Sequence, residues 1–120
     1  MKKLKQYTDS QFYVDSCSFL KNASIIVRNM SCDDKHAFGH DLSKLIRDAV
    51  TNFSLSYKEN DKQEKLKFAK DTLYKLELVS IQLNLLKDIS VITEKQFTNL
   101  FLHLGLLMTQ LNGWCNSLEK

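Results

Sequence analysis

Apolar residues recur at three- and four-residue steps along most of this chain, which is the spacing of one face of an α-helix. A first row predicts a helix over about 10–30, and a second row predicts one over about 36–58. Two further rows predict helices over about 62–89 and 94–118. The apolar positions that define the four rows are Phe12, Phe19, Leu20, Ala23, Val27 and Met30; Phe38, Leu42, Leu45, Ala49 and Phe53; Leu66, Ala69, Leu73, Leu76 and Leu83; and Leu104, Leu107, Met108, Leu111, Cys115 and Leu118.

The connections between these rows are short and polar, and two of them carry signals for a helix start. Asp61 is followed three residues later by Glu64, and Thr93 is followed by Gln96, which is the spacing of a capping box. The chain has no proline and three glycines, so little in it favours turns or strands. The sequence therefore predicts an all-α fold, an antiparallel up-down four-helix bundle that forms a single domain over residues 1–120.

The third predicted helix has a second apolar row, offset from the one that would face the core. Its members are Tyr74, Leu78, Ile81, Leu85 and Ile89, and the fourth helix adds Leu102 and Leu106 outside its own main row. A helix that is apolar on two faces is usually buried on two faces. We therefore expect a homo-oligomer, with a generous core inside one copy as the alternative.

Composition places the chain among ordinary globular proteins, with 43% hydrophobic and 26% charged residues. No apolar run is long enough to span a bilayer, and the first residues, MKKLKQYTDS, lack the apolar stretch of a signal peptide. We expect a cytoplasmic protein that is not inserted into a membrane.

The three cysteines, Cys17, Cys32 and Cys115, form no paired motif, and reduced thiols are expected.

His36 and His40 are four residues apart, close to Asp33 and Asp34, so on a helix they could bind a metal. No glutamate lies between the histidines, however, and acidic residues at a helix start also suit the helix dipole.

The chain has no Glu-x-x-His pair, phosphate-binding glycine loop or nucleophile–base arrangement. It also lacks the Arg-to-His spacing of small helical nucleases of the HEPN class. We expect a protein without catalytic residues, metal or cofactor, and an unrecognised nuclease is the least favoured alternative.

Lysines cluster where the third helix begins. Residues 58 to 75 contain six lysines and four carboxylates, which gives a net charge of +2. This segment is either a solvated helix face or a surface that binds phosphates, and repetition in an oligomer would strengthen the second possibility. The candidate nucleic-acid-binding residues are Lys58, Lys62, Lys65, Lys67 and Lys70.

The order of residues from 36 to 117 resembles a known group of four-helix-bundle proteins. The matching residues are His36 and Gly39; Leu66, Ala69, Leu73 and Leu76; Leu83, Leu86, Lys87, Asp88, Ile89 and Ser90; Lys95, Gln96 and Phe97; and Leu111, Asn112, Gly113 and Trp114. On these residues the chain resembles the accessory variability determinant proteins of diversity-generating retroelements. It is similar more broadly to the bundle proteins encoded in intervening sequences of bacterial ribosomal RNA genes.

The resemblance implies a non-catalytic accessory subunit. Members of the family form barrel-like homopentamers with a basic surface, associate with the reverse transcriptase of the retroelement and bind nucleic acid, while template RNA is copied into mutagenised cDNA. Many members carry arginines in the middle of the third helix, where this chain has Glu77, Ile81 and Gln82. An interaction or RNA-binding bundle of the ribosomal-intervening-sequence type, with a less defined role, is therefore the alternative.

The pair Gly113-Trp114 lies near the end of the fourth predicted helix and has two possible explanations. Gly113 could let a neighbouring helix or subunit approach closely, with Trp114 filling the adjoining space. Trp114 could instead close the end of the bundle. With the first explanation included, the predicted oligomer interface consists of Tyr74, Leu78, Ile81, Leu85, Gly113 and Trp114.

Overall fold

The computed structural model describes residues 6–120. Over this range four long helices form, and they lie near the four predicted segments. They are α1 (Gln11–Arg28), α3 (His40–Lys58), α4 (Lys62–Asp88) and α5 (Glu94–Glu119). The shorter elements are η1 (Tyr7–Asp9), α2 (Cys32–Asp34) and the π-helical turn η2 (Lys35–Gly39). The prediction of an all-α four-helix bundle is confirmed.

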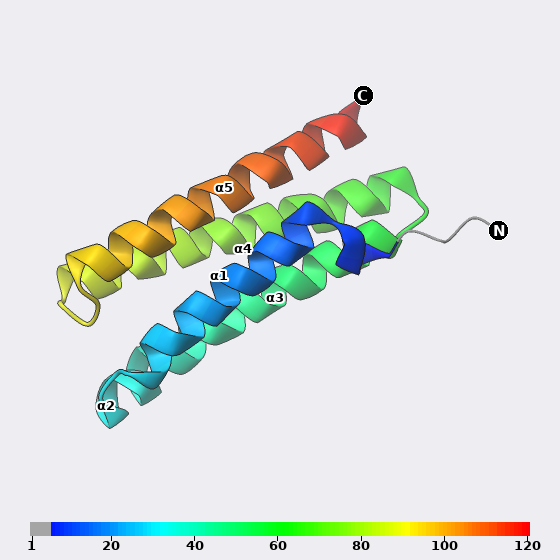
Figure 1. Cartoon of the computed structure of the whole chain (residues 1–120). Coiled ribbons are helices and arrows are strands. Elements are labelled where there is room, and N and C mark those ends of the chain that lie inside the picture. Colours follow the sequence, from blue (N-terminus) through cyan, green and yellow to red (C-terminus); the bar gives the residue numbers. More distant parts are fainter. Residues whose placement is uncertain (1–5) are drawn as a thin grey trace.

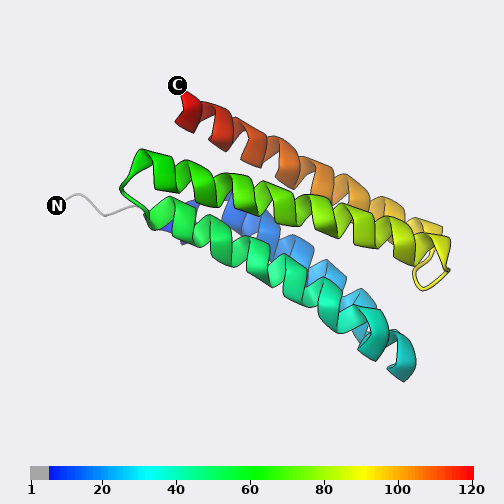
Figure 2. The same cartoon turned by 180° about the vertical axis from the view of Figure 1, so that it is seen from behind.

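Consecutive long helices run antiparallel because each connection is short (Figures 1 and 2). Around the bundle, α1 packs on α3, α3 on α4, α4 on α5, and α5 on α1. The molecule is elongated, with extents of 50 × 29 × 22 Å. The start of α1 and the end of α5 lie at the same end of the bundle, together with the connection between α3 and α4 (Figure 1).

The four predicted apolar rows meet in one core. Each long helix contributes large side chains that are almost completely shielded from solvent, and the buried residues follow the three- and four-residue spacing of the sequence. They include Phe12, Phe19, Ala23 and Val27; Leu42, Ile46, Ala49 and Phe53; Leu76, Val79, Leu83 and Leu86; and Leu100, Leu104, Leu107 and Leu111. The periodicity therefore identified the correct inward face of every helix.

Helical structure before α3 begins earlier than predicted. The Ser31 hydroxyl accepts a hydrogen bond from the Asp34 amide at 3.1 Å, so Ser31 caps a helical segment that starts at Cys32. This segment passes through the π-helical turn into α3. The predicted start at about residue 36 is therefore wrong by about one turn, because the polar residues at this point carry no apolar periodicity.

The two predicted caps differ in how completely they form. At α5, Thr93 Oγ1 accepts from the Gln96 amide at 3.1 Å and Gln96 Oε1 accepts from the Thr93 amide at 2.9 Å, so this capping box is confirmed. At α4, Asp61 Oδ2 accepts from the Glu64 amide at 3.1 Å. The Asp61 amide, however, donates to Glu59 Oε1 at 3.1 Å, so Glu59 takes the place predicted for Glu64.

Candidate functional site

The five candidate lysines lie near one end of the bundle, where α3 leads into α4. Lys58 is the last residue of α3, and the others occupy the first turns of α4. Four of the five are exposed, and Lys65 is half-buried. The turn between α3 and α4 therefore brings the candidate lysines together at one end of the bundle.

Several of these lysines already have partners within the chain. Lys70 Nζ lies 3.2 Å from Glu119 Oε1 near the end of α5. Lys62 Nζ donates to the carbonyl oxygen of Lys120, and Lys58 Nζ lies 5.0 Å from the centre of the Tyr7 ring. Exposed charged contacts of this kind contribute little to stability, so they hold the lysine amines only weakly.

Lys65 differs from the other lysines because its amine is drawn into an aromatic cluster. Its Nζ donates to the Tyr57 carbonyl oxygen at 2.9 Å and lies 5.4 Å from the centre of the Trp114 ring. Loss of hydration on burial lowers the pKa of Lys65, and the charge of Glu59 opposes this shift. Lys65 is thus a structural lysine, and a weaker candidate for phosphate binding than Lys67, which is exposed.

A buried serine holds this cluster together. Ser56 is fully shielded; its hydroxyl donates to the Lys65 carbonyl oxygen at 2.7 Å and accepts from Trp114 Nε1 at 3.2 Å. The Trp114 ring also stacks on Tyr57, with ring centres 6.1 Å apart. Trp114 is therefore half-buried and packs against residues of its own chain. Sequence reasoning missed Ser56, although its position three residues after Phe53 places it on the core face of α3.

The second apolar row of α4 lies on the side of the helix opposite the core. Tyr74, Ile81, Leu85 and Ile89 are each more than half exposed. On α5, Leu102 is 71% exposed, the highest value among the large apolar residues that the structure describes. Leu78, the remaining member of the predicted row, is half-buried beside α3. One copy of the chain therefore leaves most of both predicted outer rows uncovered.

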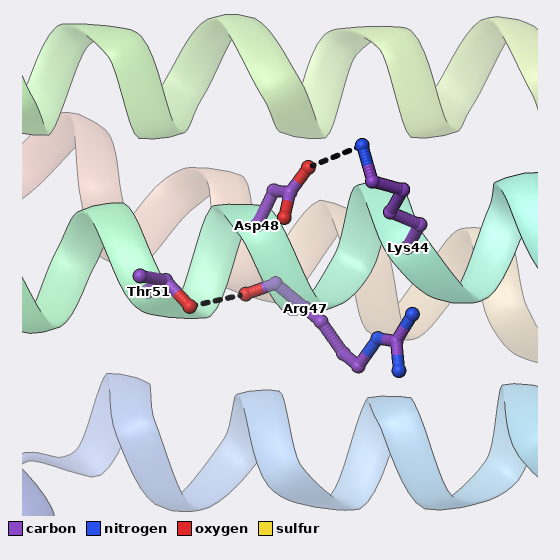
Figure 3. A network of polar contacts seen from close by, with 4 residues as sticks. All are labelled: Lys44, Arg47, Asp48 and Thr51. Carbon is purple, nitrogen blue, oxygen red and sulfur yellow. Dashed lines mark hydrogen bonds and ion pairs between the residues drawn. The ribbon is translucent and has the colours of Figure 1, made fainter.

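Charged residues of α3 flank the outer row of α4. A groove between the two helices is lined by Asp41, Lys44, Leu45, Asp48, Leu78, Ile81 and Gln82. Within it, Lys44 Nζ and Asp48 Oδ2 form an ion pair at 3.8 Å and point toward α4 (Figure 3). Arg47 extends from α3 on the side of α1, and its carbonyl oxygen accepts from Thr51 Oγ1 at 3.0 Å (Figure 3). The apolar row thus has a charged border on one side.

Gly113 lies exposed on α5, one residue before Trp114. If a Cβ atom were added there, no atom of the described chain outside its local helix would lie within 4 Å. Within residues 6–120, no other helix approaches Gly113 closely, so the explanation that Gly113 admits a neighbouring helix of the same chain is wrong. The explanation through a neighbouring subunit stays a prediction.

The two histidines of the candidate metal site lie on adjacent turns. The rings of His36 and His40 are 5.5 Å apart between their centres, and both residues are exposed. Among the described residues, no group of three or more histidine, cysteine or acidic side chains is arranged to hold a metal ion. In the same part of the chain, no helix is both long and apolar enough to cross a membrane.

The cysteines differ in how accessible they are to reagents. Cys17 and Cys32 are exposed and Cys115 is buried, and all three are free thiols. Burial raises the pKa of Cys115, and Glu119 raises it further, so little thiolate forms there at neutral pH.

With Ellman's reagent we expect the two exposed thiols to react at least about tenfold faster than Cys115. A Cys115→Ser variant should lose only the slow phase, and a fast phase of three thiols in the wild type would contradict this.

Comparison of the sequence with known protein families and with curated proteins found no match.

Proposed function

We propose that the chain is a non-enzymatic scaffold that assembles into a homo-oligomer and binds nucleic acid through phosphates. The observation that carries this proposal is the apolar outer row of α4, Tyr74, Ile81, Leu85 and Ile89, which stays uncovered in a single copy. Exposed apolar rows of this length are typical of surfaces that another protein covers. A second copy of the chain is the partner that is always available.

The position of the outer rows favours a ring. The α4 row and the α5 residues Leu102 and Leu106 belong to different helices of the same copy. If the α4 row of one copy contacts the α5 face of the next, the interface is heterologous, and such interfaces close into rings when the rotation permits. Trp114 is left out of this interface because its ring packs within its own chain. The sequence resemblance suggests five copies.

Nucleic-acid binding would use the lysines that the chain leaves accessible. Lys67 is exposed at the start of α4, and Lys58 and Lys62 lie near it. A ring repeats this group in every copy, and repeated weak sites on one assembly bind a long RNA or cDNA with increased avidity. Contacts of this kind recognise phosphates without reading the base sequence.

Together with the sequence resemblance, these features support a role as the accessory protein of a diversity-generating retroelement. In this role the cytoplasmic assembly would hold the reverse transcriptase and present template RNA or cDNA to it. The second candidate is an interaction bundle of the ribosomal-intervening-sequence type without a nucleic-acid role. One observation favours it: four of the five candidate lysines, Lys58, Lys62, Lys65 and Lys70, each contact a partner within the chain.

A gel-shift titration with single-stranded RNA tests nucleic-acid binding. We expect affinity to fall about threefold for each phosphate contact between about 50 and 200 mM salt. Lys67→Glu should weaken binding severalfold, because the charge reversal is repeated in every copy. Lys21→Glu is the matched control, since it makes the same change of charge at an exposed position of α1.

Two results would count against the nucleic-acid role. Affinity that does not change with salt would exclude phosphate contacts, and equal losses in Lys67→Glu and Lys21→Glu would show that binding does not involve the start of α4. Either result would leave the second candidate as the better account. Co-purification with the reverse transcriptase would then distinguish a polymerase partner from other proteins.

A further inference from the structure

A cavity of about 360 Å³ lies between the start of α1, the end of α3 and the C-terminal half of α5. Its volume falls in the range of about 300–1,000 Å³ that is usual for small-molecule sites. The residues that line it are Ser10, Gln11, Phe12, Phe53, Tyr57, Gln110, Leu111, Gly113, Trp114 and Ser117. The predicted functions give this cavity no role.

Aromatic side chains form much of the cavity lining. The Phe12 and Phe53 rings are packed together with their centres 4.4 Å apart, and both are buried. The Tyr57 and Trp114 rings are stacked with an angle of 17° between their planes, and both are only half-buried. Aromatic rings bind other aromatic rings in stacked or edge-to-face contacts, so this lining suits a planar ring.

Gly113 lies at the cavity beside Trp114. Glycine inside a helix weakens the helix relative to alanine, and here no close contact within the described chain requires it. A larger side chain at residue 113 would take up space at the cavity lining. The missing side chain therefore keeps this part of the cavity open.

The charges around the cavity favour a neutral ligand. None of the described residues that line it has a charged side chain. Lys65, which is not part of the lining, places its amine 5.4 Å from the centre of the Trp114 ring and would repel a second cation. The nearby carboxylate of Asp15 already accepts hydrogen bonds from Gln11 at 2.9 Å and Gln110 at 2.8 Å. An aromatic site for a quaternary ammonium ion would instead need rings without a competing cation beside them.

We propose that this cavity binds a small neutral molecule built on a planar aromatic ring. The ring contacts Tyr57 and Trp114, and the polar side chains of Ser10 and Ser117 contact its substituents. The site lies within one chain, so the proposal does not depend on assembly or on nucleic-acid binding.

The experiment uses benzimidazole as a probe, because it is a neutral bicyclic ring at pH 8. Trp114 is the only tryptophan of the chain, and its fluorescence reports on the cavity directly. We expect a saturable change in Trp114 emission, and shifts of the Gly113 and Ser117 amides in NMR spectra. Gly113→Leu and Ser117→Phe, which fill the cavity from successive turns of α5, should each weaken binding at least about tenfold. Gly105→Leu is the matched control, since the described chain leaves open space there too.

Three outcomes would overturn the proposal. The first is the absence of a saturable change in the folded wild-type protein. The second is unchanged affinity in both filled variants, with circular dichroism showing that they are folded. The third is tighter binding of phenyltrimethylammonium than of benzimidazole, which would assign the cavity to cations.

Discussion

Replacing Ile81 and Leu85 together by glutamate is expected to dissociate the proposed assembly and leave the four-helix bundle folded. The two side chains are 56% and 53% exposed in one copy, so their replacement removes little packing within the chain. In an assembly the same positions would be buried, and an unpaired buried charge costs several kcal/mol. Since a tenfold change corresponds to about 1.4 kcal/mol, association should weaken by at least about 1,000-fold.

Light scattering measures the mass of the assembly, and circular dichroism shows whether the helices persist. The matched control is the double variant Val14→Glu, Ile25→Glu on α1, whose side chains are 47% and 44% exposed. It makes the same change of charge on another face and should keep the wild-type mass. A wild-type monomer at micromolar concentration, or an unchanged mass in the α4 variant, would exclude this interface.

The inward face of each helix could be predicted because burial imposes a periodicity that is local in sequence. Phe19, Leu42, Leu83 and Leu104 each lie on a predicted row, and each is at most 1% exposed. The capping box of Thr93 and Gln96 was predictable for the same reason, since both partners lie within one turn. Antiparallel packing then followed from the short connections between helices.

The start of the helical stretch that leads through α2 and η2 into α3 could not be predicted in the same way. From Ser31 to His36 the chain is polar, so periodicity gave no indication that a helix had begun. The first turn depends on the Ser31 cap, and no glutamate or glutamine follows at the capping-box position. The π-helical turn over Lys35–Gly39 adds a wider turn, which no spacing rule indicated.

The sequence also could not predict which lysines are exposed and which are held by partners within the chain. Counting charges treats Lys65 and Lys67 alike, although one lies against Trp114 and the other is exposed. The difference depends on how the end of α5 packs against the start of α4, which also pairs Lys70 with Glu119. Contacts between residues distant in sequence therefore decide which candidate lysines are exposed.

The same substitution at two glycines is expected to have opposite effects on stability. A Cβ added at Gly39 would lie 2.7 Å from Val27 Cγ1 and 3.3 Å from Met30 Sδ, where α1 ends against the start of α3. Val27 is buried and β-branched, so it can rotate only at a cost. Overpacking should outweigh the gain in helix propensity, and Gly39→Ala should lower the free energy of unfolding by about 1–2 kcal/mol.

Gly105→Ala is the matched substitution, because no described side chain lies within 4 Å of its added Cβ. There only the helix propensity changes, and the free energy of unfolding should rise by about 0.5–1 kcal/mol. Urea denaturation in the Ile81→Glu, Leu85→Glu background measures both effects without a contribution from assembly. Val27→Ala removes the obstructing methyl, so Gly39→Ala should cost much less in that background. If Gly39→Ala instead stabilises the chain as Gly105→Ala does, the close approach of α1 to the start of α3 places no constraint on residue 39.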